Sequence, residues 1–380
     1  MSRARDFADL AAAYSGGALA NRNMIINGNM AINQRSVNLS IVHDGTSSGY
    51  ACDRWLVQEV QHDELEGTLE QVAVTDLAGF KNALKWTTTE PESAIAANEA
   101  FDICQKIEGQ NCQRLAYGLS GAKKATLSFW VKSSVTGTYG VNFYKDDAAG
   151  ALTAKNFTST YAISSADTWE KKTVTVPADT GSSGAINDDT GEGLRISWHL
   201  GTGSDFTSQD TSSAWTDYTN AGWAYGHAQN GVTTTDNATW FLTGVQFELG
   251  EVATPFEDIS YGDNLAKCQR YLYVVIPKGI GAASYFGNGW YYDTDKVLGF
   301  IHFPVTMRAV PTLEVSNASN DFGIYRAADK DDFDDFILNS ANIKGMNISN
   351  LSDVSGTAGH AGGLYLNDAT NAYLHVMSEI

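Results

Sequence analysis

The sequence lacks the features that mark a nucleic-acid-binding or membrane-surface protein. It has 25 lysines and arginines against 44 aspartates and glutamates, so its formal net charge is −19, and its basic residues form no cluster. Binding to a phosphate backbone depends on basic groups that displace counterions, so we expect no nucleic-acid partner. The same lack of basic clusters argues against binding to anionic membranes.

Cysteine pairs and long apolar runs are also missing. Cys52, Cys104, Cys112 and Cys268 form no Cys-x-x-Cys pair, which excludes the zinc and redox motifs built on that spacing. We expect buried free thiols in a protein made in a reducing cytoplasm. No apolar run of about ten residues follows Met1, so the sequence predicts neither a secretory signal nor insertion into a membrane.

Recognisable catalytic motifs are absent as well. The sequence contains no His-Glu-x-x-His, no Gly-x-Ser-x-Gly and no phosphate-binding Gly-Lys-Ser/Thr loop, and its seven histidines are scattered. We therefore predict that the protein is not an enzyme and holds no cofactor, apart from a structural calcium discussed below. A carboxylate pair that hydrolyses glycosides stays open, because its geometry arises from distant sequence positions.

The residues that are present indicate a β-rich protein with many turns. There are 36 glycines but six prolines, together with 9 tryptophans, 17 tyrosines and 16 phenylalanines. Apolar and other residues alternate in segments such as 127–132 and 194–199, and loops rather than long helices separate these segments. This pattern predicts an antiparallel β-sandwich. We expect Trp55, Trp130, Trp169, Trp198 and Trp240, which lie in or beside such segments, to belong to the core.

A chain of 380 residues is too long for one ordinary domain, so we expect two. The predicted sandwich covers residues 21–260. Residues 261–273 read as a connector helix, and residues 274–380 form a second β-rich domain. Residues 1–20 are predicted to form a short helical arm.

The arm is predicted from four residues at helical spacing. Phe7, Leu10, Ala11 and Tyr14 recur at steps of three and four residues, and two glycines follow them. An isolated helix of this length is marginal in water, so it should dock against something. We expect an attachment or trimer-bundling arm; packing against the chain's own sandwich is the alternative.

Residues 241–249 are predicted to form the last strand of the sandwich. Phe241, Thr243, Val245, Phe247 and Leu249 alternate with Leu242, Gln246 and Glu248, which predicts one buried face along the whole segment. Pro255 then ends the strand, because proline cannot donate to a sheet ladder.

Several segments, taken together, resemble structural proteins of tailed bacteriophages, a family of tail-fibre and carbohydrate-binding-like virion proteins. The resemblance covers residues 21–273. The segments that carry it are Asn21–Arg35, Gly49–Trp55, Ala125–Lys132, Gly244–Gly250, Ala253–Glu257 and Cys268–Tyr271.

The resemblance implies a jelly-roll sandwich in a virion component that is assembled in the host cytoplasm and exposed on the particle surface. We expect a tail fibre or receptor-binding protein that contacts host cell-surface polysaccharide. It should form a homotrimer and join other virion proteins through its arm. The alternatives are a capsid decoration or head-fibre protein with the same sandwich, and a polysaccharide depolymerase.

Two long polar loops, residues 178–193 and 201–237, are candidates for a binding surface. Aromatic rings that stack on sugars, with amides and carboxylates that bind hydroxyl groups, are concentrated in the second loop. The alternative is that these rings fill the interior of the loop or a subunit interface. The predicted glycan-binding residues are Trp215, Tyr218, Trp223, Tyr225, Asp217 and Asn220.

A second aromatic group lies in the C-terminal domain. Asn288-Gly289 is typical of a hairpin turn, and aromatic residues flank it on both sides. Cross-strand packing explains these aromatics, and an exposed tip for receptor contact is the alternative. The group consists of Tyr285, Phe286, Trp290, Tyr291 and Tyr292.

Two acidic stretches are calcium candidates, because calcium prefers oxygen ligands from such loops. The first contains Asp188, Asp189 and Glu192, and the second is residues 329–335. Neither has the spacing of an EF-hand loop, so solvated acidic loops are the alternative.

Overall fold

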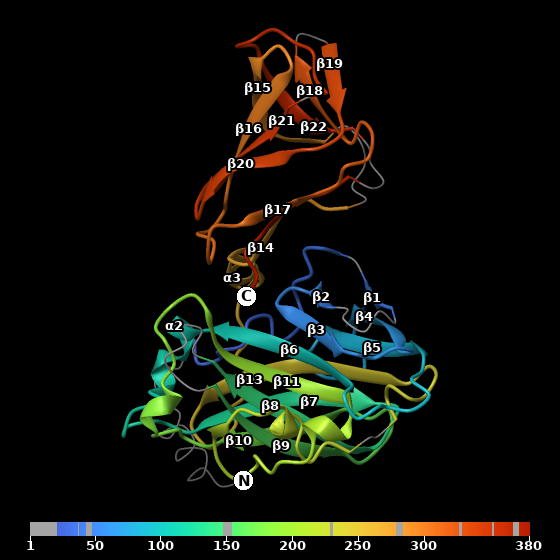
Figure 1. Cartoon of the computed structure of the whole chain (residues 1–380), viewed down its shortest axis with the longest axis vertical. Helices are drawn as coiled ribbons and strands as arrows, with labels where there is room; N and C mark the ends of the chain where they lie inside the picture. Colours follow the sequence, from blue (N-terminus) through green and yellow to red (C-terminus); the bar gives the residue numbers. More distant parts are fainter. Residues whose placement is uncertain are drawn as a thin grey trace. The chain divides into compact units, whose positions relative to one another are not determined.

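The structure is a computed structural model whose described residues form two compact units (Figure 1). Unit 1 comprises the described residues of Met1–Asn33 and Val37–Ser260, with Ile380; unit 2 comprises Gln34–Ser36 and the described residues of Tyr261–Glu379. The described residues are 21–36, 38–42, 48–146, 154–228, 231–278, 284–326, 329–351, 353–367 and 372–380.

The predicted arm, with Phe7, Leu10, Ala11 and Tyr14, lies outside the described residues. Within them, no helix has the length and apolar character needed to cross a membrane. All four cysteines are free and buried, as predicted.

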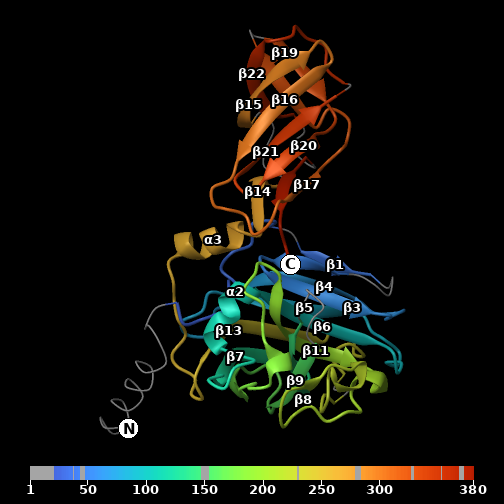
Figure 2. The same ribbon diagram turned by 60° about the vertical axis from the view of Figure 1, so that its left-hand side comes forward.

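Unit 1 is an antiparallel sandwich of two sheets, which confirms the predicted fold class. The six-stranded sheet has the order β1-β4-β5-β13-β7-β10, and the seven-stranded sheet has the order β12-β9-β8-β11-β6-β3-β2. The chain passes repeatedly from one sheet to the other, as in jelly rolls. Figures 1 and 2 label most of these strands.

The six-stranded sheet consists of β1 (Leu39–Ile41), β4 (Glu66–Ala73), β5 (Asn82–Glu90), β7 (Ala125–Ser133), β10 (Glu170–Val176) and β13 (Thr239–Leu249). The seven-stranded sheet consists of β2 (Ser48–Cys52), β3 (Trp55–Val60), β6 (Ala100–Glu108), β8 (Gly137–Lys145), β9 (Lys155–Ile163), β11 (Glu192–Thr202) and β12 (Thr216–Asp217). The short helices of unit 1 are α2 (Gly109–Cys112), η1 (Gln113–Leu115), η2 (Ser182–Gly184), η3 (Ser204–Phe206) and η4 (Asn220–Gly222).

Aromatic rings from both sheets meet in the core between them. Trp86 of β5 lies 4.5 Å from Phe101 of β6, and Phe129 of β7 lies 5.6 Å from Trp198 of β11, measured between ring centroids. Such pairs contribute about 0.5–1.5 kcal/mol each beyond the burial of their area. The core therefore joins the sheets through large rings on alternate residues of their strands.

The core prediction is right for Trp55, Trp198 and Trp240, which are fully buried, but wrong for Trp130 and Trp169, which are half-buried at the surface. Alternation explains Trp130, because its neighbours in β7 point into the core and successive side chains of a strand point to opposite faces. Trp169 precedes β10 and lies against the outer face of the same sheet.

Strand β13 has no single buried face, contrary to the prediction for residues 241–249. Its pairing with β7 shifts register between Thr243 and Gln246, and Gly244 has a φ of +61°. Before this β-bulge Leu242 points into the core; after it, Val245 and Phe247 do. Phe241 therefore lies on the outer face, although it belongs to the same alternating pattern.

Four of the segments that carry the family resemblance bond to one another within unit 1. The Asn23 side chain accepts a hydrogen bond from the Phe247 amide (3.0 Å) and donates one to the Val245 carbonyl (3.1 Å). The Asn23 amide donates to the Glu257 carboxylate (2.8 Å), and the Trp55 indole donates to the Asn27 carbonyl (3.1 Å). These segments thus form a structural seam within unit 1.

Unit 2 is also antiparallel and β-rich, as predicted. Its sheets have the orders β19-β18-β22-β15-β16-β21-β20 and β14-β23-β17, and Figure 2 shows β16, β21 and β20 side by side. Its elements are α3 (Tyr261–Gln269), β14 (Leu272–Ile276), β15 (Tyr285–Asp293), β16 (Lys296–His302), β17 (Thr312–Val315), β18 (Phe322–Arg326), β19 (Asp329–Phe333), β20 (Ile337–Asn342), β21 (Gly345–Asn350), β22 (Ala361–Leu366) and β23 (Leu374–Met377).

The hairpin predicted at Asn288-Gly289 is wrong, because both residues lie inside β15. Gly289 pairs with Gly299 on one side and with Gly362 on the other. A side chain at Gly289 would contact Leu364 of the core, so this glycine permits close packing instead of making a turn.

Candidate functional site

The predicted glycan-binding residues do not form one group. Trp215 is buried: its indole N–H donates to the Pro177 carbonyl (2.8 Å), and its ring packs at 5.5 Å from Tyr117. The ammonium group of Lys145 lies 4.6 Å from the centre of the Trp215 ring. Protein groups therefore cover this ring, as in the alternative in which it fills the loop interior.

Tyr218 and Trp223 lie together in a second aromatic cluster. Their ring centroids are 5.8 Å apart, and Tyr144 lies within 5.6 Å of both. Trp223 is buried, whereas Tyr218 is half-buried and donates a hydrogen bond to the Asn220 side chain (2.8 Å). The structure thus brings Tyr218, Trp223 and Asn220 together, with Tyr218 and Asn220 nearer to solvent.

The remaining two candidates lie apart from a common centre. Asp217 is exposed and forms an ion pair with Lys155 (3.2 Å). Tyr225 is half-buried, and its hydrogen bond to Asp210 helps to lower the pKa of that carboxyl after the larger effect of Ser212. Glycan binding by the six residues stays a prediction.

Two buried histidines hold the segment that carries Trp223. A ring nitrogen of His199 lies 3.1 Å from the Trp223 carbonyl, and His227 Nδ1 accepts a hydrogen bond from the Gly140 amide (3.1 Å). Burial lowers the pKa of His199 to about 3 and that of His227 to about 4. Both imidazoles are therefore neutral near pH 7.

The first calcium candidates are not gathered around one point. Glu192 forms ion pairs with Arg195 (2.8 Å) and Lys106 (3.2 Å), while Asp188 is exposed. Asp189 accepts a hydrogen bond from the Gly191 amide (2.8 Å), which closes a local turn. The oxygens of Glu192 thus already have cationic partners.

The second acidic stretch, predicted as a loop, contains strand β19 (Asp329–Phe333). Asp331 accepts hydrogen bonds from the Tyr291 hydroxyl (2.8 Å) and the Ser355 amide (2.6 Å), and Asp332 forms an ion pair with Lys330 (2.8 Å). Calcium binding at either stretch stays a prediction.

In the second aromatic group, Tyr291 is buried, whereas Tyr285 and Tyr292 are about 60% exposed. Tyr285 packs against Tyr325 and Tyr365 of neighbouring strands, at 6.4 and 6.1 Å between ring centroids. The rings of this group thus pack across strands and are also exposed. The structure is compatible with both predictions for the group, cross-strand packing and an exposed tip for receptor contact.

The sequence interpretation missed an aromatic row on the outer face of the six-stranded sheet. All its rings are half-buried, so part of each is open to solvent. The row consists of Trp169, Phe241, Trp130, Phe80 and Phe256.

Several of the rings in the row are in contact or pack against the same residue. Trp169 and Phe241 lie 6.0 Å apart, and Phe80 and Phe256 lie 5.3 Å apart. A Cβ atom at Gly244 would meet Phe80 at 2.7 Å and Trp130 at 3.0 Å, so both rings pack against the bulge glycine. The bulge thus leaves the space in which these two rings sit.

Charged groups border one end of the aromatic row. The Lys132 ammonium lies 4.9 Å from the Trp169 ring centre and 4.6 Å from that of Phe241, and it pairs with Asp76 at 2.9 Å. Asp76 also accepts a hydrogen bond from the Trp169 indole (2.9 Å). These bonds from Lys132 and Trp169 lower the pKa of Asp76, so its carboxylate is charged at neutral pH.

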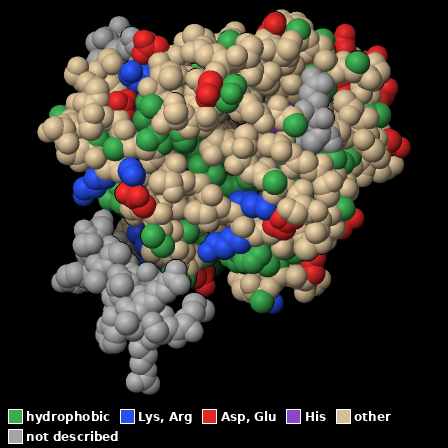
Figure 3. All heavy atoms as spheres, turned by 90° about the horizontal axis from the view of Figure 1, so that it is seen from below, with side chains coloured by type: hydrophobic (Ala, Val, Ile, Leu, Met, Phe, Trp, Pro, Cys, Tyr) green, Lys and Arg blue, Asp and Glu red, His purple; other side chains and the backbone are tan. Residues whose placement is uncertain are grey.

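The end view of the molecule shows mixed charges. In Figure 3, lysine and arginine side chains lie beside aspartate and glutamate side chains, and uncharged groups separate these pairs. The described residues seen on this face therefore form no continuous basic patch of the kind that binds a phosphate backbone.

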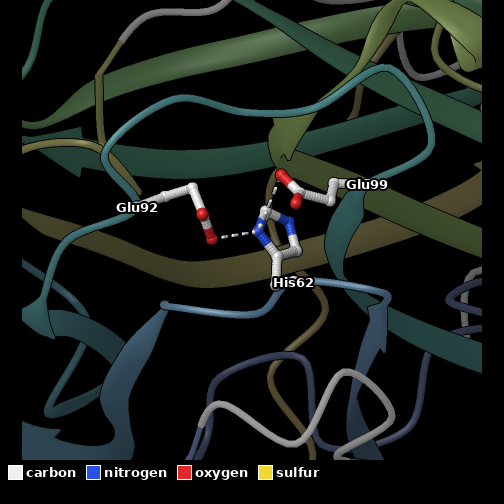
Figure 4. A group of neighbouring side chains, drawn as sticks. All are labelled: His62, Glu92 and Glu99. Atoms are coloured by element: carbon white, nitrogen blue, oxygen red, sulfur yellow. Dashed lines mark hydrogen bonds and ion pairs between the residues drawn. The ribbon is translucent and has the colours of Figure 1, made fainter.

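A group of three titratable residues, which we call the acid–histidine cluster, lies inside unit 1. It consists of His62, Glu92 and Glu99, all buried (Figure 4). His62 Nδ1 is 3.0 Å from a Glu92 oxygen and 3.7 Å from a Glu99 oxygen. Within the described part of the chain, this is the one such group whose potential ligand atoms all lie within 4.8 Å of one another.

No family model matches the sequence, and no curated protein matches it. Among solved structures, the chain is similar to the enzymatically active domain of tailspike protein 4 of bacteriophage CBA120, with 13% identity and a TM-score of 0.31. That match covers 60% of this chain and 22% of the tailspike chain, so it spans less than a quarter of the relative.

Carbohydrate-binding modules are further neighbours. The family 11 module of a Clostridium thermocellum cellulase is 9% identical, with a TM-score of 0.29 over 55% of this chain and 98% of the module. A xylan-binding domain from Paenibacillus barcinonensis is 15% identical, with a TM-score of 0.27 over 56% of this chain and 99% of that domain. Because these scores are low, the fold assignment rests on the strand pairing and not on these similarities.

Proposed function

We propose that this protein is a non-enzymatic structural component of a tailed-phage particle that binds host surface glycan, in the tail-fibre or receptor-binding class. Two observations support the proposal. The family resemblance of residues 21–273 supports the phage particle, and the structural seam gives these recognisable segments a common physical role. The aromatic row supports glycan binding, and it is the observation that carries this half of the proposal.

The aromatic row has the chemistry that sugar binding requires. Sugars present C–H faces that stack on aromatic rings, and hydroxyl groups that bond to charged and amide side chains. Trp169 and Phe241 supply half-exposed rings, while Asp76 and Lys132 lie within contact of them.

Binding of the purified full-length chain to host polysaccharide tests the glycan half. We expect Trp169→Ala and Phe241→Ala each to weaken binding about tenfold, because each removes a stacking ring that contributes about 1–2 kcal/mol. Tyr261→Ala is the matched control, since it removes a 64% exposed ring from unit 2 that belongs to neither aromatic group, and it should leave binding unchanged. A glycan array with no binder would contradict the glycan half.

Gold-labelled antibodies against the chain test the particle half. Label on the tail of phage particles is the expected result. Label confined to the head would instead indicate the decoration or head-fibre alternative, and release of reducing sugar from host polysaccharide would indicate a depolymerase.

A further inference from the structure

The acid–histidine cluster buries two carboxyl groups and one imidazole close together. Among the described residues, neither Glu92 nor Glu99 forms an ion pair with a lysine or arginine, and His62 is their shared partner. The Nδ1 atom of His62 faces both carboxyl groups and can offer a lone pair to a cation. Burying two carboxylates close together is unfavourable unless a cation or protons compensate them.

We propose that the acid–histidine cluster binds one divalent transition-metal ion of the Zn²⁺ type through His62 Nδ1 and one carboxylate oxygen each from Glu92 and Glu99. This site is independent of the proposed function. The three ligand atoms already lie within 4.8 Å of one another, so small movements bring them to one ion.

The donor set selects the class of metal. One imidazole nitrogen and two carboxylate oxygens suit zinc and its transition-metal neighbours, which accept mixed nitrogen and oxygen ligands. Calcium prefers six to eight oxygens and is therefore disfavoured. A second carboxylate oxygen or a water molecule can complete a four-coordinate site.

The position of the cluster indicates a structural role for the metal. His62 follows β3, while Glu92 and Glu99 lie near the two ends of the loop between β5 and β6, so one ion would join the segment after β3 to both ends of that loop. Its ligands are buried, which leaves no route for a large substrate. Metal binding would thus stabilise folded unit 1.

The loop between β5 and β6, which carries Glu92 and Glu99, also forms hydrogen bonds to both ends of the long segment between β11 and β13. The Gly203 amide donates to the Glu99 carbonyl (2.8 Å), and the Glu92 amide donates to the Thr233 carbonyl (2.9 Å). The Asp205 amide donates to the Ala97 carbonyl (2.9 Å). A metal at the cluster would therefore fix the base of the loop that carries Tyr218 and Trp223.

Titration of untagged, chelator-treated full-length protein with Zn²⁺, followed with a competing chromophoric chelator, tests the site. We expect one tight equivalent per chain and a higher melting temperature in the presence of zinc. Co²⁺ should give a visible absorption spectrum that zinc abolishes. If folded wild-type protein takes up no ion, the proposal is wrong, and the three residues of the cluster share protons instead.

Substitutions assign the ion to these residues. Glu92→Gln and Glu99→Gln keep the side-chain shape but remove a ligand charge, and each should weaken zinc binding about 100-fold or more. Glu251→Gln is the matched control, because it makes the same substitution at a carboxylate of unit 1 that is 63% exposed and outside the cluster, and it should leave the affinity unchanged. Equal zinc affinity in the wild type and both glutamine variants would place the ion elsewhere and refute the assignment.

Discussion

The two units place their aromatic residues differently. Unit 1 holds eight of the nine tryptophans, and Trp55, Trp86, Trp198 and Trp240 are fully buried between its sheets. In unit 2, Trp290 is 38% exposed on β15. Two large sheets cover each other's inner faces in unit 1, whereas the seven-stranded sheet of unit 2 leaves Tyr285, Trp290 and Tyr292 on an open face. Aromatic content alone therefore does not distinguish a core from a contact surface.

The largest expected difference between the units comes from removing one tryptophan from each. Trp198→Ala should destabilise unit 1 by about 3–5 kcal/mol, because it leaves a large cavity between the sheets. Trp290→Ala should change the stability of unit 2 by less than about 1 kcal/mol. Calorimetry of the two variants measures both effects, and similar losses in both would remove the contrast.

Acid should affect unit 1 through His199 and His227. Their folded pKa values, about 3 and about 4, lie below the unfolded value, so the unfolded state binds more protons below about pH 6.5. Their contribution to stability is present above pH 6.5 and is lost as the pH falls toward 4. Each should lose about 2 kcal/mol between pH 7 and pH 5.

Denaturant unfolding of unit 1 at pH 7 and pH 5 measures this loss, and His227→Gln should reduce the difference by about 2 kcal/mol. A pH dependence that is unchanged in this variant would mean that His227 is not one of the groups responsible.

A smaller effect should come from the structural seam of unit 1. A side chain at Gly28 would overlap the carbonyl oxygen of Val245. The amide of Val245 also donates a hydrogen bond to the Gly28 carbonyl (2.9 Å), so the two segments are held close together. Gly28→Ala should destabilise unit 1 by about 1–3 kcal/mol through displacement of β13. Gly121→Ala, which meets no atom within 4 Å, is the control and should stay within about 0.5 kcal/mol of the wild type. Equal melting temperatures for the two variants would show that the seam tolerates a methyl group.

The smallest expected change is a gain in unit 2. Gly262 lies in α3 with open space around its α-carbon. Gly262→Ala should stabilise unit 2 by about 0.5–1 kcal/mol, because alanine loses less backbone entropy in a helix. Urea unfolding monitored by a unit 2 probe measures this gain, and no change in midpoint would indicate that α3 frays before the unit unfolds.

Alternating apolar residues were enough to predict the antiparallel sandwich and the second β-rich unit, and the lack of Cys-x-x-Cys pairs was enough to predict buried thiols. They were not enough at Gly244, because a one-residue bulge reverses which side chains of β13 face the core. The same limit applies at Asn288-Gly289, where turn-forming residues lie in a central strand whose neighbours supply glycines opposite them. Local patterns give the period of a strand, but its pairing depends on distant segments.

The candidate sites show the same limit more strongly. The aromatic row combines residues from 80 to 256, and the acid–histidine cluster combines positions 62, 92 and 99 without a ligand-spacing motif. The alternation of Trp130 with Leu127, Phe129 and Val131 was a usable signal, because it places Trp130 on the outer face. No comparable signal in the sequence identifies His62 among the seven histidines.

The position of β13 has a consequence for synthesis of the chain. This strand lies between β5 and β7, yet it is the last strand of unit 1 to be made, and β23 likewise lies between β14 and β17. Until the ribosome has released each closing strand, β5 and β7 keep unpaired edges, which are sites for wrong pairing with other chains. Neighbouring nascent chains on one messenger RNA would then be most prone to aggregate just before each unit closes.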